Sequence, residues 1–178
     1  MSGSNKIEGS TVSRRLALAG IAAPPLTSGA ASADDVVEVL IKLAAAKNAA
    51  FMRGDMKRWS ELTPIAADFT LMQPFGGPAS HGFDSSPTRL EEMSHFFRNG
   101  TTDLQMAATY AGENIVVLVM IERQRAEVGG LPEQDWSLRV TEVYRKAGSD
   151  WQLAHRHADP LVQRVALERA AALARGIF

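Results

Sequence analysis

Two histidines stand two residues apart near the end of the chain, in the segment Trp151-Gln152-Leu153-Ala154-His155-Arg156-His157. If this segment is a strand, both imidazoles leave the same face, and Trp151 and Leu153 share that face. Imidazole changes its charge near neutral pH, so such a pair can act as a general base or bind a ligand. A tight metal site would need a third ligand, and no spacing in the sequence fixes one, so we predict no metal site.

Other polar residues are expected beside this pair. Arg139 and Thr141 share one face of the preceding predicted strand, and Asp159 follows His157 by two residues. We therefore predict a polar wall in which His155, His157, Arg139 and Asp159 carry acid/base chemistry. The alternative is structural, with a cross-strand salt bridge that fixes the register of the strands and histidines that hydrogen-bond to their neighbours.

A second polar pair, Lys47 and Asn48, interrupts the apolar arc of a predicted helix, between Ala44 and Phe51. Polar groups in such an arc need partners, and a ligand in a pocket could supply them. The alternative is that Lys47 extends its amine to the rim while Asn48 binds backbone groups. With aromatic residues and a loop histidine added, the predicted ligand-binding residues are Lys47, Asn48, Trp59, Gln73, Phe75, His81 and Thr141.

Composition limits the remaining functions. The chain has 178 residues, no cysteine and a formal net charge of -1, which suits one globular domain. Thiol chemistry and cysteine-ligated metals are excluded. No basic block indicates nucleic-acid binding, and no apolar run is long enough to span a membrane. We expect no cofactor.

The elements that would position these residues indicate an α+β fold. A long helix is predicted from Asp34 to about Gly54, with Asp34 or Asp35 as its cap. Shorter helices are predicted near 56–62 and 87–97, with a strand at 68–72 between them. Four strands follow at about 102–111, 115–125, 136–145 and 151–158, and then a C-terminal helix over 161–175. We expect a curved antiparallel sheet wrapped around the long N-terminal helix, with a tapering hollow between them.

Residues 1–33 differ in character from the remainder. Arg14-Arg15 precedes a short apolar stretch and the small-residue segment Ala31-Ser32-Ala33. This order is typical of a twin-arginine export signal, which would make the mature domain, residues 34–178, periplasmic or secreted. The alternative is a disordered arm on a cytoplasmic protein.

Three segments resemble the nuclear-transport-factor-two-like superfamily, and its SnoaL-like branch in particular. They are Phe51-Met52-Arg53-Gly54-Asp55 with Trp59, the strand and turn 67–76, and the paired strands 139–145 and 151–157. The resemblance implies a cone-shaped domain like that of ketosteroid isomerases. The positions aligned with the isomerase catalytic groups are Gln73, Lys47 and about Thr141, and none matches, which disfavours that reaction.

Two functions remain open. One is a cofactor-free isomerase, cyclase or dehydratase acting on a small organic molecule by acid/base chemistry. The other is a non-catalytic ligand-binding or assembly module. In both cases the resemblance implies a homodimer through the outer face of the sheet.

Overall fold

The structure is a computed structural model, and it describes residues 32–177. The expected export signal therefore lies outside the described residues, apart from its last two, Ser32 and Ala33. The elements follow in the order α1 (Ala33–Met52), α2 (Met56–Glu61), β1 (Ile65–Met72), β2 (Ser80–His81), α3 (Pro87–Phe96), β3 (Phe97–Ala111), β4 (Ile115–Val128), β5 (Leu131–Asp135), β6 (Leu138–Ala147), β7 (Asp150–Asp159) and α4 (Leu167–Ala174). Within this part of the chain, no helix is both long and apolar enough to cross a membrane.

Helix α1 begins at a capping box. The Ser32 hydroxyl accepts a hydrogen bond from the Asp35 amide at 3.1 Å, and the Asp35 carboxylate accepts one from the Ser32 amide at 3.1 Å. The cap is therefore Ser32, and the prediction that Asp34 or Asp35 caps the helix is wrong. Asp35 instead supplies the reciprocal bond three residues later, which satisfies a second free amide at the helix start.

Helix α3 confirms its predicted start. The Ser86 hydroxyl accepts a hydrogen bond from the Arg89 amide at 3.3 Å, and Pro87 occupies the first helical turn. The helix runs directly into β3 at Phe97, so this strand begins earlier than the predicted start at about residue 102. A register shift lies between Arg98 and Thr101, and the strand continues through it.

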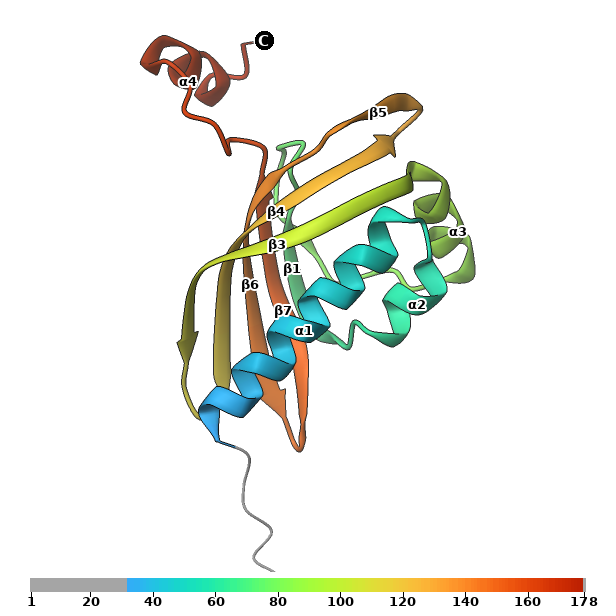
Figure 1. Ribbon diagram of the computed structural model, residues 1–178, viewed down its shortest axis with the longest axis vertical. Helices are drawn as coiled ribbons and strands as arrows, with labels where there is room; N and C mark the ends of the chain where they lie inside the picture. Colours follow the sequence, from blue (N-terminus) through green and yellow to red (C-terminus); the bar gives the residue numbers. More distant parts are fainter. Residues whose placement is uncertain (1–31, 178) are drawn as a thin grey trace, which may run out of the picture. The chain divides into compact units, whose positions relative to one another are not determined.

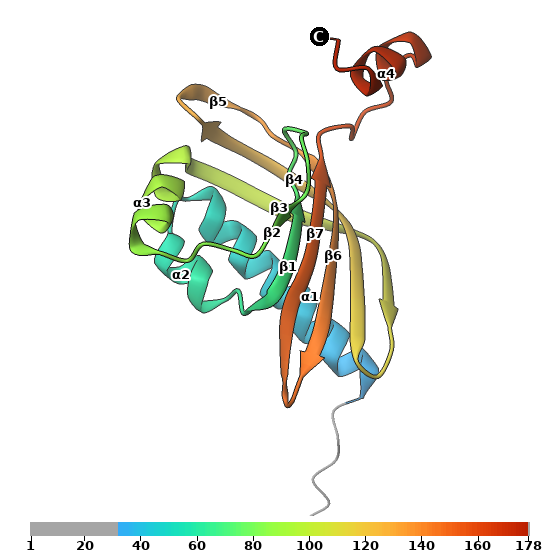
Figure 2. The same ribbon diagram turned by 180° about the vertical axis from the view of Figure 1, so that it is seen from behind.

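The strands form one sheet in the order β2-β1-β7-β6-β4-β3, with β5 paired to β4. All neighbours are antiparallel except β1 and β7, which run parallel, so the expectation of an antiparallel sheet holds for all but this pair. The sheet curves around α1 without closing (Figure 1), and the view from behind shows β6 and β7 lying over that helix (Figure 2). This arrangement confirms the predicted α+β class.

The face of the sheet toward α1, called the inner face below, carries the core. Leu138, Val140 and Tyr144 of β6 alternate on it, and Leu40 and Ala44 of α1 pack against it. Residues between these positions, such as Thr141 and Val143, lie on the opposite outer face. Strand alternation therefore determines which side chains lie on each face of the sheet. One irregularity in β7 shifts this alternation.

That irregularity is a bulge at Ala154. Tyr144 pairs with Leu153, and the next residue of β6, Val143, pairs with His155, which leaves Ala154 without an opposite residue on β6. The extra residue shifts the alternation by one position. Leu153 consequently lies on the inner face together with Arg156, whereas His155 and His157 lie on the outer face.

Candidate ligand-binding site

A cavity of about 810 Å³ lies between the inner face of the sheet, α1, α2 and α3. Most of its lining is apolar, which is the usual character of a small-molecule site. Phe51 and Trp59 pack with tilted rings at 5.8 Å between ring centroids, and Trp59 and Phe83 do so at 5.2 Å. The other apolar lining residues are Met52, Ile65, Phe69, Leu71, Pro74, Phe75, Met93, Phe96, Phe97, Trp136, Leu138 and Leu153.

Charged side chains gather at one wall of this cavity. Arg156 donates to both carboxylate oxygens of Glu122, at 2.8 and 2.7 Å, and to Glu142 Oε1 at 2.8 Å. Lys47 Nζ donates to the same Glu142 oxygen, and the Tyr144 hydroxyl donates to Glu142 Oε2 at 2.8 Å. These five residues are called the ionic cluster below. Its two cations and two carboxylates balance in formal charge.

Glu142 and Arg156 keep their charges within the largely buried ionic cluster. Glu122 and Glu142 have side-chain exposures of 1% and 0%. Burial alone would raise the pKa of Glu142, but the charges of Lys47 and Arg156 outweigh that effect and lower this pKa to about 2. Burial also lowers the pKa of Arg156, and the charges of Glu122 and Glu142 reverse the shift, so this pKa is raised. The same burial, with the charge of Glu142, raises the pKa of Tyr144, which remains a donor.

Uncharged side chains on the inner face and on α1 hydrogen-bond to one another beside the ionic cluster. Asn48 Nδ2 donates to Thr102 Oγ1 at 2.8 Å and to Gln124 Oε1 at 3.1 Å. Gln124 Nε2 and Trp136 Nε1 are buried and have no hydrogen-bond partner among residues 32–177. Both side chains belong to the cavity wall, so this wall holds unsatisfied donors.

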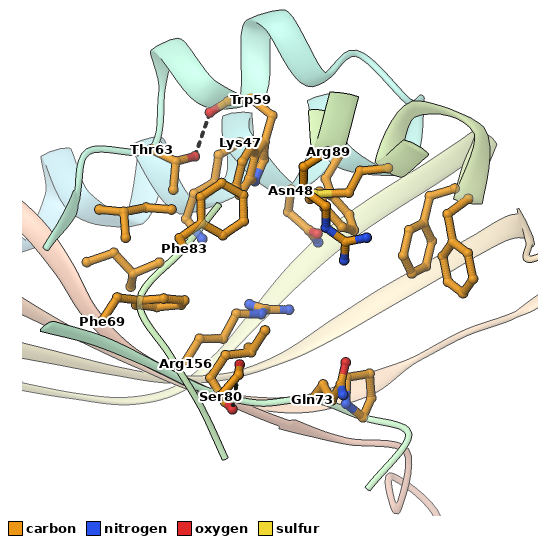
Figure 3. Close-up of a pocket in the computed structure, with 18 of the residues that line it drawn as sticks. Lys47, Asn48, Trp59, Thr63, Phe69, Gln73, Ser80, Phe83, Arg89 and Arg156 are labelled. Carbon is orange, nitrogen blue, oxygen red and sulfur yellow. Dashed lines mark hydrogen bonds between the residues drawn. The ribbon is translucent and has the colours of Figure 1, made fainter. Parts of the chain in front are cut away.

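The structure brings five of the predicted ligand-binding residues to this cavity: Lys47, Asn48, Trp59, Gln73 and Phe75. Figure 3 shows Lys47 and Asn48 on the side of α1, with Arg156 reaching toward them from the sheet. His81 is exposed on β2 and is outside the lining, although its neighbours Ser80 and Gly82 belong to it. Thr141 lies on the outer face, because its strand position alternates with those of Val140 and Glu142.

The predicted polar wall forms on the outer face and does not line this cavity. Arg139 binds both oxygens of Asp159, at 2.9 and 3.0 Å, and this pair lines a hollow of about 300 Å³ together with Thr141 and His157. His155 Nδ1 lies 2.7 Å from the Thr70 hydroxyl. The expected position of the two histidines, on one face with Leu153, is corrected by the bulge at Ala154. Their catalytic role stays a prediction.

Four residues of this site were not predicted from the sequence: Glu122, Gln124, Glu142 and Arg156. A signal for three of them was present, since Glu122 and Gln124 alternate with Met120 and Ala126 in an apolar strand, and Glu142 falls between Val140 and Tyr144. Charged or polar residues at inward positions of a strand must find partners or a ligand. Arg156 had no such signal, because strict alternation placed it outward.

Comparisons with known proteins agree with this fold. No protein-family model and no curated protein matches the chain. Among solved structures, a "putative dehydratase from the NTF2-like family" of Streptomyces avermitilis has a TM-score of 0.60 at 20% identity, covering 74% of this chain and 100% of its own. An NTF2-like superfamily protein of Salmonella enterica has a TM-score of 0.62 at 16% identity, covering 77% of this chain and 99% of its own.

A third structure has the same architecture. A protein of Xanthomonas campestris, described as a "putative calcium/calmodulin dependent protein kinase II association domain", has a TM-score of 0.52 at 15% identity and covers 80% of this chain and 95% of its own. Since these identities are low, they establish architecture alone. The curved sheet around α1, with its cavity between helix and sheet, therefore has the NTF2-like, SnoaL-like fold.

Proposed function

We propose that this domain binds a small, mainly apolar organic molecule in the cavity between α1 and the inner face of the sheet. The observation that carries the proposal is the pairing of an 810 Å³ apolar cavity with a wall of hydrogen-bond donors. Apolar lining supplies affinity through burial, and a few oriented polar groups select what is bound. Binding needs no cofactor.

Turnover is the second candidate. Lys47 and Arg156 both belong to the cavity wall, where they would stabilise negative charge on a carbonyl oxygen of the ligand. The neighbour described as a dehydratase supports such chemistry in this fold. Acid/base work by His155 or His157 would need access from the outer face, so binding is the better supported function.

Blocking the cavity tests the proposal. Ser80 lines the cavity from β2 and is exposed, so Ser80→Trp introduces an indole there with little risk to the core. We expect Nile red, an uncharged carbonyl dye, to bind the native protein and to bind Ser80→Trp at least about tenfold more weakly. Fluorescence titration measures both affinities.

Two variants serve as controls for this titration. His81→Trp adds the same indole to the adjacent residue of β2, which is outside the lining, and His157→Ala removes an imidazole on the outer face. Both should bind the dye like the native protein. A dye affinity that fell equally in Ser80→Trp and His81→Trp would place the dye elsewhere, and absence of binding to the native protein would reject the function.

We also propose that two copies pair through the outer face of the sheet. Val117, Val119, Ile121 and Val143 make this face apolar, and Tyr110 on β3 is 64% exposed. A wide antiparallel sheet with an apolar outer face is covered by another layer in most proteins. The neighbour described as an association domain supports pairing in this fold.

Light scattering at micromolar concentration checks the dimer. The native mass is expected at twice the 19.2 kDa of the chain. Val119→Asp, which puts a carboxylate into the face, should shift the mass to that of a monomer because the charge would be buried unpaired. Ser60→Asp adds the same charge on the exposed side of α2 and should leave the dimer intact. A monomeric native mass would reject the pairing.

A further inference from the structure

Arg156 uses only part of its hydrogen-bonding capacity within the ionic cluster. A guanidinium carries five N–H donors arranged in a planar fork. Nη1 donates to Glu122 and to Glu142, and Nη2 donates to Glu122, which accounts for three of the five. The remaining edge, formed by Nε–H and the second Nη2–H, has no partner among residues 32–177.

This edge is reachable from the cavity. Arg156 belongs to the lining and keeps a side-chain exposure of 20%, whereas its partners Glu122 and Glu142 keep 1% and 0%. The exposed part of the group is therefore on the cavity side, and Figure 3 shows the side chain extending into that space. Because Glu122 and Glu142 bind three of its five N–H donors, the orientation of the guanidinium is fixed before any ligand arrives.

Other donors of the wall also lack acceptors. Gln124, which is 3% exposed, has an amide nitrogen without a partner, and Lys47 uses one of its three N–H donors, on Glu142. Unsatisfied buried donors cost stability unless an acceptor from outside reaches them. The wall thus holds several donors that lack acceptors among residues 32–177.

From this geometry we infer that the bound molecule is an organic monocarboxylic acid, with its carboxylate on the free Nε–Nη2 edge of Arg156 and its apolar body against Trp59 and Phe83. The inference rests on the proposed function of the same cavity. A carboxylate matches the two parallel donors of this edge, and a single carbonyl or hydroxyl oxygen does not.

The balanced charge of the ionic cluster does not oppose an incoming acid. Glu142 lies on the far side of the guanidinium from its free edge, and Glu122 occupies the neighbouring Nη1–Nη2 edge, so the positive group is the nearest charge to the ligand. Interaction energy falls with distance, and the near attraction therefore exceeds the more distant repulsion. Lys47, which shares Glu142 with Arg156, adds a second positive charge at the same wall.

Competition against bound Nile red tests the inference on the native protein. The competitors are 2-naphthoate and its methyl ester, which share one ring system and differ in charge and in the number of acceptors. We expect the acid to displace the dye at least about tenfold more strongly than the ester, as for a bidentate charged hydrogen bond. Equal displacement by both would overturn the inference while leaving the proposed function in place.

Variants identify the residue that binds the carboxylate. Arg156→Lys keeps the charge and removes the fork, so the preference for the acid should fall at least about fivefold while the ester is unaffected. Arg89, the other arginine of the lining, is paired with Glu92 and half-exposed, and Arg89→Gln should leave the preference unchanged. Loss of the preference in Arg89→Gln alone would move the carboxylate to the rim and overturn the assignment to Arg156.

The ionic cluster can make Arg156→Lys unstable, so a second comparison avoids that residue. Gln124→Leu removes the unsatisfied amide and keeps the charges of the ionic cluster. If the carboxylate lies beside this amide, the variant should weaken the acid about threefold and leave the ester unchanged. If the native protein does not bind Nile red, the proposed function itself fails. The ratio of acid affinity to ester affinity tests only the carboxylate inference.

Discussion

Replacing Glu142 by glutamine is expected to lower the free energy of unfolding by about 3 to 5 kcal/mol, the range for breaking a buried ion pair from one side. The reason is charge balance. Glu142 is the shared partner of Lys47 and Arg156, and without its charge Lys47 loses its carboxylate partner while Arg156 depends on Glu122 alone. Urea denaturation of native protein and variant measures the loss.

A matched pair of variants separates charge imbalance from loss of packing. Lys47→Met removes one cation, and the double variant Lys47→Met with Glu142→Gln removes one charge of each sign. We expect the double variant to be more stable than Glu142→Gln alone by at least about 1 kcal/mol, since it restores the balance. If the decreases in unfolding free energy of Lys47→Met and Glu142→Gln simply add in the double variant, the ionic cluster does not act as a unit.

The pH dependence of stability follows from the same group. The pKa of Glu142 is lowered from 4.5 to about 2 in the folded protein, so folding favours the charged form. Its contribution to stability is fully present above about pH 4.5 and is lost as the pH falls toward 2. Glu142→Gln should therefore show a smaller decrease in stability over this interval than the native protein.

Gly54→Ala is expected to destabilise the domain by more than about 3 kcal/mol. Gly54 has φ of +75°, and a Cβ there would lie 2.5 Å from the carbonyl oxygen of Ser94 and 2.9 Å from that of Phe97. Both atoms belong to the backbone where α3 meets β3, so neither can move without displacing that junction. The left-handed conformation adds about 1 to 2 kcal/mol for any residue with a Cβ.

Gly77→Ala provides the matched control. Gly77 has φ of +90°, but nothing lies within 4 Å of the position of its Cβ. Its substitution should cost only the conformational part, about 1 to 2 kcal/mol. The difference between the denaturation midpoints then measures the close approach of α1 to the α3–β3 junction. Equal losses of stability in Gly54→Ala and Gly77→Ala would contradict this close contact between Gly54 and the junction.

Helices α1 and α3 could be predicted because their signals are local, whereas α4 begins at Leu167, six residues after its predicted start at Leu161. The arc Leu40, Ala44, Phe51 defined the buried side of α1, and Ser86-Pro87 defined the start of α3. The cap at Ser32 was missed because Asp34 and Asp35 are also good caps, and only the reciprocal bond from Asp35 distinguishes Ser32.

The candidate site was predicted on its helical side, whereas its charged sheet residues were missed, although Glu122, Gln124 and Glu142 carried a signal. Lys47 and Asn48 stood out as polar residues in an apolar arc. Arg156 did not, since its face depends on one unpaired residue two positions earlier, and a bulge leaves no reliable trace in composition or alternation. The parallel pairing of β1 with β7 is likewise a long-range contact that no local pattern encodes.

The bulge in β7 also determines which changes of chain length this strand can accept. Ala154 has no opposite residue on β6, so a gene that lost this single codon would still encode a strand with Arg156 toward the cavity and both histidines outside. Loss of a codon between Arg156 and Asp159 would instead exchange the two faces beyond that point, because side chains alternate with a period of two. Among homologous chains, length variation in this strand should therefore concentrate at position 154.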